Sequence, residues 1–212
     1  MSADFHIVDM ENNPRKEHFK HFMSMPYPYT GVTVEVDITE WQSKMKENGY
    51  PFFLSFLYAA GRAANNVPEF RMRIRDGQVI EYDVCCSSYT IALDNGTYCY
   101  CVADTSLPFQ QYLEVTRKAQ QEAIENPGID DGDDELSLFF ISSLPWISFT
   151  SVTHPVPAVP DSNPRITWGK YHRSESRLMI PVNVQCNHAL ADGLHLAEFY
   201  EQLNRELKKM TE

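Results

Sequence analysis

The sequence of 212 residues predicts an α+β fold, in which helices pack against a large, mostly antiparallel mixed sheet. Two observations predict it. Turn signals at Asp76-Gly77 and Asp94-Asn95-Gly96 each separate two short strand-like stretches, as in β-hairpins. Four more strand candidates then follow before a last amphipathic helix. A hydrophobic content of 43% at this length suits one sizeable core, so we expect a single domain over residues 1–212.

The predicted helices follow from the spacing of apolar residues and from end signals. Pro14 suits the first turn of a short amphipathic helix, and Asp37 or Thr39 can cap the next one, which stops at Asn48-Gly49. The third is almost wholly apolar, which predicts a buried central helix. The five predicted helices are residues 14–23, 40–47, 52–64, 108–124 and the stretch that follows Asp192-Gly193.

The predicted strands alternate apolar and polar residues or form short apolar runs between turn residues. A charged turn is expected at residues 172–177 and an acidic connection at 126–135. Five carboxylates lie between Asp130 and Glu135; we interpret them as a solvated loop, with calcium as the alternative, although the ligand spacing of a calcium loop is absent. The predicted strands are residues 32–36, 71–75, 79–82, 89–93, 97–102, 136–142, 147–152, 166–171 and 178–186.

Composition excludes several classes of partner. The chain has 29 acidic and 18 basic residues, a net charge of −11, and no basic patch, so we expect no nucleic acid. It lacks an export leader and the run of ~18–20 apolar residues of a membrane helix, so we expect no membrane and a cytoplasmic location. An odd number of cysteines fits reduced thiols in that compartment: Cys85, Cys86, Cys99, Cys101 and Cys186.

The candidate for chemistry is His188, between a predicted strand and the helix that begins near Asp192-Gly193. Such a junction presents a fixed side chain to a cleft, and a histidine with its unperturbed pKa of ~6.5 suits general-base work. Taken alone, the pattern is also typical of a structural histidine beside a helix cap. A metal site with Asp192 and His195 lacks a convincing third ligand, so we expect no metal.

Several segments together resemble the chloramphenicol acetyltransferases. Residues 186–195, Cys-Asn-His-Ala-Leu-Ala-Asp-Gly-Leu-His, resemble the family signature, whose catalytic histidine stands four residues before Asp-Gly. Asn187 replaces the first of the two histidines that the family usually carries. The other matching segments follow in the same order along nearly the whole chain: residues 15–19, 68–72 with Asp76-Gly77, 140–149 and 167–171.

The resemblance implies a two-layer sandwich of the CoA-dependent acyltransferase type and a homotrimer with active sites between subunits. It implies that His188 is the general base and that Ser142 donates a hydrogen bond to the oxyanion. It further implies that Asp192 and Arg15 form a buried ion pair that holds the histidine loop, and that Thr167 acts on the oxyanion through water.

Further residues are assigned to the two substrates by the same resemblance. Trp146 and Tyr171 are expected to line the CoA channel, whereas Phe22, Tyr98 and Tyr100 are expected at the acceptor pocket. The pocket departs from the family pattern, because the two tyrosines and residues 153–160 replace groups that contact the antibiotic in relatives.

The expected activity is transfer of an acetyl group from acetyl-CoA to a hydroxyl of chloramphenicol, directly in a ternary complex and without a metal. Two alternatives stay open. One is an acyltransferase of the same fold with another hydroxyl or thiol acceptor, such as a dihydrolipoamide acyltransferase. The other is a trimeric protein that binds a hydrophobic ligand without turnover.

Overall fold

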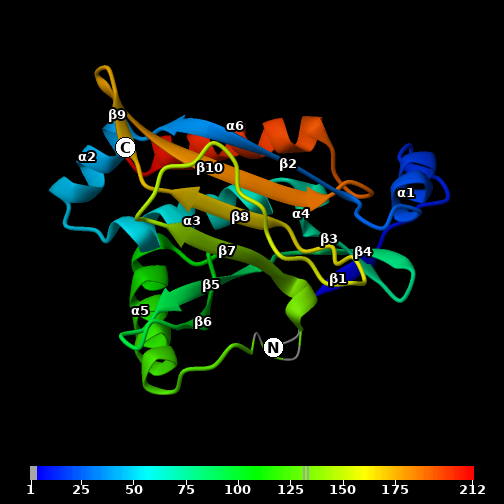
Figure 1. Cartoon of the computed structure of the whole chain (residues 1–212), viewed down its shortest axis with the longest axis horizontal. Coiled ribbons are helices and arrows are strands. Elements are labelled where there is room, and N and C mark those ends of the chain that lie inside the picture. The colour runs from blue at the N-terminus through cyan, green and yellow to red at the C-terminus, as the bar shows by residue number, and fades with distance from the viewer. Residues whose placement is uncertain (1–3, 131, 133) are drawn as a thin grey trace.

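The computed structural model describes residues 4–130, 132 and 134–212. These residues form a seven-stranded mixed sheet, in the order β2-β10-β8-β7-β5-β6 with β9 also paired to β10, and a three-stranded sheet in the order β1-β4-β3. Helices α3 and α6 lie behind the large sheet, and α5 runs beside its lower strands (Figure 1). The predicted α+β fold with a mixed sheet covered by helices is confirmed.

The elements have the following bounds. The helices are α1 (Lys16–Met23), α2 (Thr39–Glu47), α3 (Phe52–Asn65), α4 (Pro68–Arg71), α5 (Phe109–Glu125) and α6 (Gly193–Lys209), with a 3-10 turn at Glu135–Ser137. The strands are β1 (Phe5–Ile7), β2 (Tyr29–Asp37), β3 (Met72–Arg75), β4 (Gln78–Tyr82), β5 (Cys86–Ala92), β6 (Tyr98–Ala103), β7 (Leu138–Leu144), β8 (Arg165–Gly169), β9 (His172–Ser174) and β10 (Arg177–Asn187).

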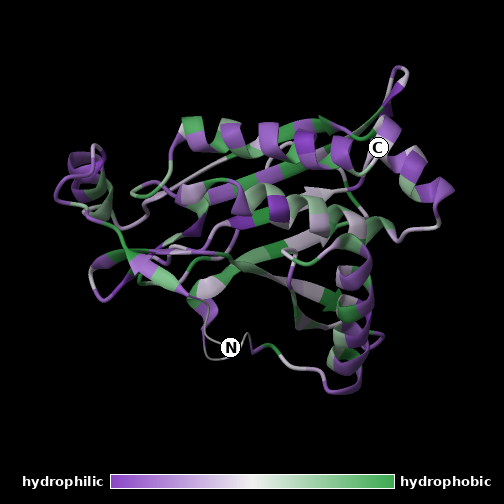
Figure 2. Cartoon of the chain, turned by 180° about the vertical axis from the view of Figure 1, so that it is seen from behind, coloured by the Kyte–Doolittle hydropathy of each residue, from purple (hydrophilic) through white to green (hydrophobic). Residues whose placement is uncertain are grey.

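Helix α3 is the buried centre of the helical layer, as its apolar sequence predicts. Figure 2 shows hydrophilic residues along α5 and α6, whereas α3 is paler and greener. A side chain at Gly61 would come within 2.7 Å of Thr105 and 2.8 Å of Ser87, so glycine permits the close approach of α3 to this part of the fold. Arg62 of α3 is paired with Glu206 of α6 at 2.8 Å, which joins the two helices.

The predicted hairpins are confirmed. Asp76 and Gly77 adopt positive φ angles of 51° and 77° and connect β3 to β4, as a primed turn requires. The second turn connects β5 to β6. The sequence did not predict β1, whose three exposed residues pair with β4 and add the outer strand of the small sheet.

The predicted strand at residues 147–152 is wrong. Strands β7 and β8 pair directly and in parallel, with Ser142 opposite Thr167, so no position remains between them for another strand. Parallel neighbours need a crossover connection. Residues 145–164 form it without regular structure and cross the sheet on the face opposite α3 and α6 (Figure 1).

Residues 172–177 and the acidic connection at 126–135 both contain structure that was not predicted from the sequence. The charged stretch 172–177 is not wholly a turn, because His172–Ser174 forms β9 and pairs with β10 around Glu175, whose φ is 55°. In the acidic connection, Tyr82 donates a hydrogen bond to Asp134 at 2.9 Å, while Asp131 and Asp133 lie outside the described residues.

Within the described ranges, none of the helices has the length and apolar content needed to cross a lipid bilayer. All five cysteines carry free thiols. Burial raises the pKa of Cys186 to about 12 and that of Cys86 to about 11, which keeps both thiols protonated at neutral pH.

Candidate active site

His188 stands immediately after β10, in the short loop that leads to α6, and its side chain is half-buried. Its backbone N–H donates to the carbonyl of Pro28 at 2.7 Å. Its ring Nδ1 lies 3.1 Å from the carbonyl oxygen of Ala191. Because a carbonyl only accepts hydrogen bonds, this contact places the proton on Nδ1 and leaves the Nε2 lone pair available as a base.

Phe22 of α1 fixes the plane of this imidazole. The two rings are stacked, with centroids 3.9 Å apart and planes inclined by 13°. The helix that the sequence predicts at residues 14–23 therefore contributes directly to the position of His188. Phe22, expected at the acceptor pocket, lies beside the predicted base.

The side chain of Asn187 stabilises the same loop through two hydrogen bonds. Its side-chain oxygen accepts the N–H of Ala189 at 3.0 Å, and its amide donates to the carbonyl of Asp161 at 2.9 Å. The backbone carbonyl of Asn187 accepts the N–H groups of Leu190 and Ala191 at 3.1 Å each. The residue that replaces the first histidine of the family signature is thus a structural support of the turn.

Arg15 and Asp192 form the expected ion pair, through Nη1 of the arginine and Oδ2 of the aspartate. The expectation that the pair is buried is wrong, since 20% of the Arg15 side chain and 33% of the Asp192 side chain are exposed. Asp192 also caps α6 by accepting the N–H of Leu194 at 3.0 Å. Burial raises the pKa of the Asp192 carboxyl, but the hydrogen bonds from Arg15 and Leu194 outweigh it and lower the pKa below its usual value.

His195 has a structural role beside this pair. Its Nδ1 accepts the backbone N–H of Asp192 at 3.0 Å, which completes a capping box at the start of α6. Its Nε2 lies 3.4 Å from a carboxylate oxygen of Glu69. Both ring nitrogens are therefore engaged. The described part of the chain contains no cluster of His, Cys, Asp or Glu arranged to hold a metal ion.

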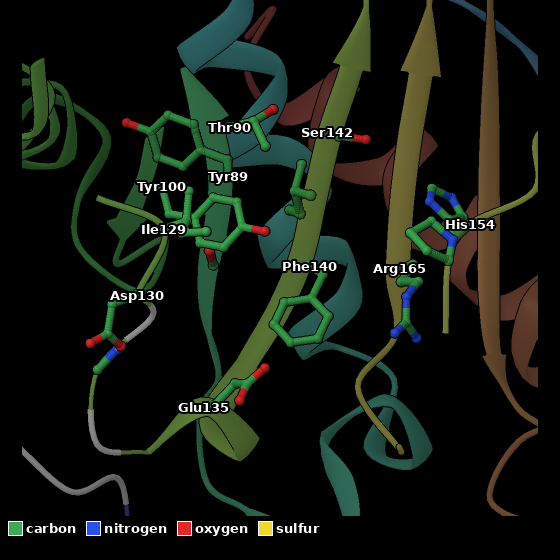
Figure 3. Close-up of a pocket in the computed structure, with 14 residues that line it drawn as sticks. Tyr89, Thr90, Tyr100, Ile129, Asp130, Glu135, Phe140, Ser142, His154 and Arg165 are labelled. Carbon is green, nitrogen blue, oxygen red and sulfur yellow. The ribbon is translucent and has the colours of Figure 1, made fainter. Parts of the chain in front are cut away.

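Ser142 and Thr167 are adjacent on β7 and β8, with their hydroxyl oxygens 2.9 Å apart. Nε2 of His154, from the crossover segment, lies 3.3 Å from the Thr167 oxygen. Figure 3 shows Ser142 pointing from β7 toward β8 and His154 on the other side of β8. His154 was not predicted from the sequence, because its position in a proline-rich stretch outside any motif gives no signal of a partner.

A cavity of about 540 Å³ opens beside Ser142 (Figure 3). Among its lining residues are Tyr100, Phe140, His154 and Arg165, so polar and aromatic groups surround it. Tyr100 thus lines the cavity as expected. Tyr98 does not: its side chain is 53% exposed, and its ring lies 5.9 Å from that of Tyr100.

Arg165 is a second cavity residue that was not predicted from the sequence. It binds both carboxylate oxygens of Asp161, at 2.9 and 2.5 Å, and its guanidinium lies 5.6 Å from the centre of the Phe140 ring. Tyr29 donates a further hydrogen bond to Asp161 at 3.0 Å. Arg165 therefore anchors the end of the crossover segment and contributes a positive charge to the cavity wall.

Trp146 and Tyr171, the residues expected at the CoA channel, both follow the ends of neighbouring strands. They come after β7 and β8, which are parallel and in register there, with Leu144 opposite Gly169. Their exposures are 71% and 40%, and Tyr171 packs against Phe52 with a ring separation of 5.3 Å. The C-terminal ends of β7 and β8 thus present two aromatic side chains to solvent.

A single chain does not bring His188 and Ser142 together. Ser142 pairs with Thr167, and Thr167 pairs with Asn183 of β10, so these three residues lie in one row across the sheet. His188 lies five residues beyond Asn183, which at about 3.3 Å per residue is about 16 Å along the strand. The predicted site residues therefore form two groups, one around His188 and one around Ser142.

The chain matches known proteins over nearly its whole length. A family model described as "Chloramphenicol acetyltransferase" matches residues 3–204. A chloramphenicol acetyltransferase of a Klebsiella species is 30% identical over 200 residues, covering 93% of this chain and 91% of the relative. Chloramphenicol acetyltransferase 2 of Escherichia coli is 30% identical over 206 residues, covering 94% and 95%.

Solved structures agree with this assignment. A chloramphenicol acetyltransferase superposes with a TM-score of 0.83 and 31% identity, covering 96% of this chain and 100% of the other. A dihydrolipoamide acetyltransferase of Azotobacter vinelandii has a TM-score of 0.65 at 20% identity over 91% of this chain and 86% of the other, a likeness of fold alone. With the family model and relatives at 30% identity in agreement with the signature around His188, this chain belongs to the chloramphenicol acetyltransferase family.

Proposed function

We propose that this chain transfers the acetyl group of acetyl-CoA to a hydroxyl of chloramphenicol, with His188 as general base. One observation carries the proposal: the imidazole is held by Phe22 and by the Ala191 carbonyl in the tautomer that leaves Nε2 free, inside the signature of the family. His195, by contrast, has a partner at each of its two ring nitrogens.

The reaction follows from these groups. Nε2 of His188 removes the proton of the acceptor hydroxyl while the hydroxyl oxygen attacks the thioester carbonyl. The carbonyl oxygen becomes an oxyanion, and the Ser142 hydroxyl donates a hydrogen bond to it; losing such a donor costs about 10²- to 10³-fold in rate. The intermediate then expels the CoA thiolate, which receives the proton from His188. The products are the acetyl ester and free CoA.

The active form is a homotrimer, in which His188 of one subunit faces Ser142 of the next. The separation of about 16 Å along the sheet within one chain supports this arrangement, because both groups must reach one reacting carbonyl. A ring of identical chains repeats one interface and so completes every site in the same way.

The other predicted site residues contact one of the two substrates or hold the His188 loop. Trp146 and Tyr171 contact CoA at the exposed edge beyond β7 and β8, while Tyr100 contacts the acceptor in the cavity beside Ser142. Arg15 and Asp192 hold the His188 loop. The chain acts as one domain in the cytoplasm.

The test is release of free CoA thiol from acetyl-CoA by the purified protein, with and without chloramphenicol. Release that requires chloramphenicol and disappears in His188→Ala supports the proposal. The matched control is His6→Ala, since the His6 side chain is 62% exposed on β1, in the smaller sheet; this variant should keep full activity. If the wild type releases no CoA with chloramphenicol but does so with another alcohol, chloramphenicol is not the acceptor.

A further inference from the structure

His154 lies close to the proposed oxyanion donor, Ser142, but has no part in the proposed proton transfer. It belongs to the crossover segment and lines the cavity beside Ser142. The residue is half-buried, and its Nε2 lies 3.3 Å from the hydroxyl of Thr167, which lies 2.9 Å from the hydroxyl of Ser142. Three hydrogen-bonding groups from three segments thus form a line that ends at the predicted oxyanion donor.

The direction of this line decides whether Ser142 has a proton to offer. Each hydroxyl carries one proton. If His154 accepts the proton of Thr167, then Thr167 has none for Ser142, and the short contact between the hydroxyls requires Ser142 to donate to Thr167. No proton of Ser142 then points at the oxyanion. If instead His154 donates to Thr167, the proton of Thr167 is available for Ser142, and in that arrangement the Ser142 proton is free for the oxyanion.

The surroundings of His154 favour the neutral ring. Burial and the positive charge of Arg165 both lower the pKa of His154. A hydrogen bond with the Asn183 side chain raises this pKa by a smaller amount. A neutral imidazole carries its proton on one nitrogen, so the tautomer sets the direction of the whole line.

We propose that His154 is a positioning residue for the proposed acetyl transfer: its Nε2–H donates to Thr167 and thereby turns the hydroxyl of Ser142 toward the oxyanion. The inference rests on the proposed function. It assigns Thr167 a role through Ser142, because the Thr167 proton is used in that contact. Through His154, the crossover segment thus takes part in orienting the oxyanion donor.

Two substitutions of His154 separate this role from simple space filling. In His154→Gln the side-chain amide reaches the position of Nε2 and can donate to Thr167, whereas in His154→Asn it is too short. We expect the glutamine variant to keep kcat within about threefold. The asparagine variant should lose about tenfold in kcat, part of the cost of a missing oxyanion donor, with little change in KM for either substrate.

A double-mutant cycle with Ser142→Ala tests the pathway. If His154 acts through Ser142, His154→Asn causes no further loss of kcat once the serine hydroxyl is absent. An equal loss in both backgrounds, or a loss confined to KM, would show that His154 does not orient Ser142. Thermal melting of each variant shows whether the protein is folded.

The ring tautomer supplies a test that needs no turnover. Nitrogen-15 chemical shifts of the His154 ring in the wild-type protein should report a protonated Nε2 and a bare Nδ1. The opposite tautomer would overturn the inference. Because this measurement requires no acceptor, it distinguishes failure of the inference from failure of the proposed acetylation of chloramphenicol, which the CoA release assay reports separately.

Discussion

Replacing Asp192 separates its two roles at the His188 loop. The carboxylate pairs with Arg15 and also caps α6 through the N–H of Leu194. Asp192→Asn keeps a good cap, because asparagine and aspartate are comparable at this position, and loses the charge. Asp192→Ala loses both interactions. The two variants should therefore differ in stability by the value of the cap.

The magnitudes follow from the geometry. A hydrogen bond between charged groups contributes about 1.5–3 kcal/mol, and the partial exposure of both side chains reduces this to about 1–2 kcal/mol through solvent screening. Loss of an N-cap costs about 1 kcal/mol more. We expect Asp192→Asn to lose about 1–2 kcal/mol of unfolding free energy and Asp192→Ala about 2–3 kcal/mol. Each kcal/mol lowers Tm by about 2–4 °C at this chain length.

The assay is thermal unfolding followed by circular dichroism, together with kcat for CoA release. Arg15→Ala should match Asp192→Asn within about 1 kcal/mol, and the double variant should lose less than the sum of the two. Glu17→Gln, which alters an exposed pair on α1, is the control and should stay within about 0.5 kcal/mol of the wild type. If Asp192→Asn melts and turns over like the wild type, the ion pair does not hold the His188 loop.

Two further predictions concern the packing around the site and the helical layer. Phe22→Ala removes the ring stacked on His188, a contact of about 0.5–1.5 kcal/mol, so kcat should fall about 3- to 10-fold and Tm by about 1–6 °C; an unchanged kcat would mean that the stacking does not orient the base. The pKa of Glu206 is raised by burial but lowered further by Lys209 and Arg62, and the net shift is downward. Its charge therefore adds stability above the unfolded pKa of about 4.3, which is lost as pH falls through the folded value. In melts from pH 7 to pH 3, Glu206→Gln should be less stable by about 1–2 kcal/mol at pH 7, and the difference should shrink as the pH falls toward 3; a constant difference would contradict this sign.

The sequence was most informative where local chemistry decides the structure. Asp76-Gly77 predicts a hairpin because few residues accept positive φ, and both adopt it. The apolar run of α3 predicts a buried helix for a similarly local reason. The resemblance to the family implies that Arg15 and Asp192 accompany His188, and the structure brings these three residues together.

The sequence was least informative where tertiary pairing decides. Residues 147–152 look like a strand, but β7 and β8 pair with each other and leave no edge between them. His154 and Arg165 belong to no motif, and the register of β8 and the path of the crossover place them beside Ser142. The distance between His188 and Ser142 likewise depends on the order of strands in the sheet, which no local pattern reveals.

Complementation between two inactive chains tests whether each active site is shared between subunits. His188→Ala and Ser142→Ala are unfolded together, mixed in equal amounts, refolded and assayed for CoA release with chloramphenicol. If each site takes His188 from one subunit and Ser142 from the next, about one site in four receives both native residues, and the mixture should show about a quarter of wild-type activity. A mixture no more active than the mean of the separate variants would contradict a site shared between subunits.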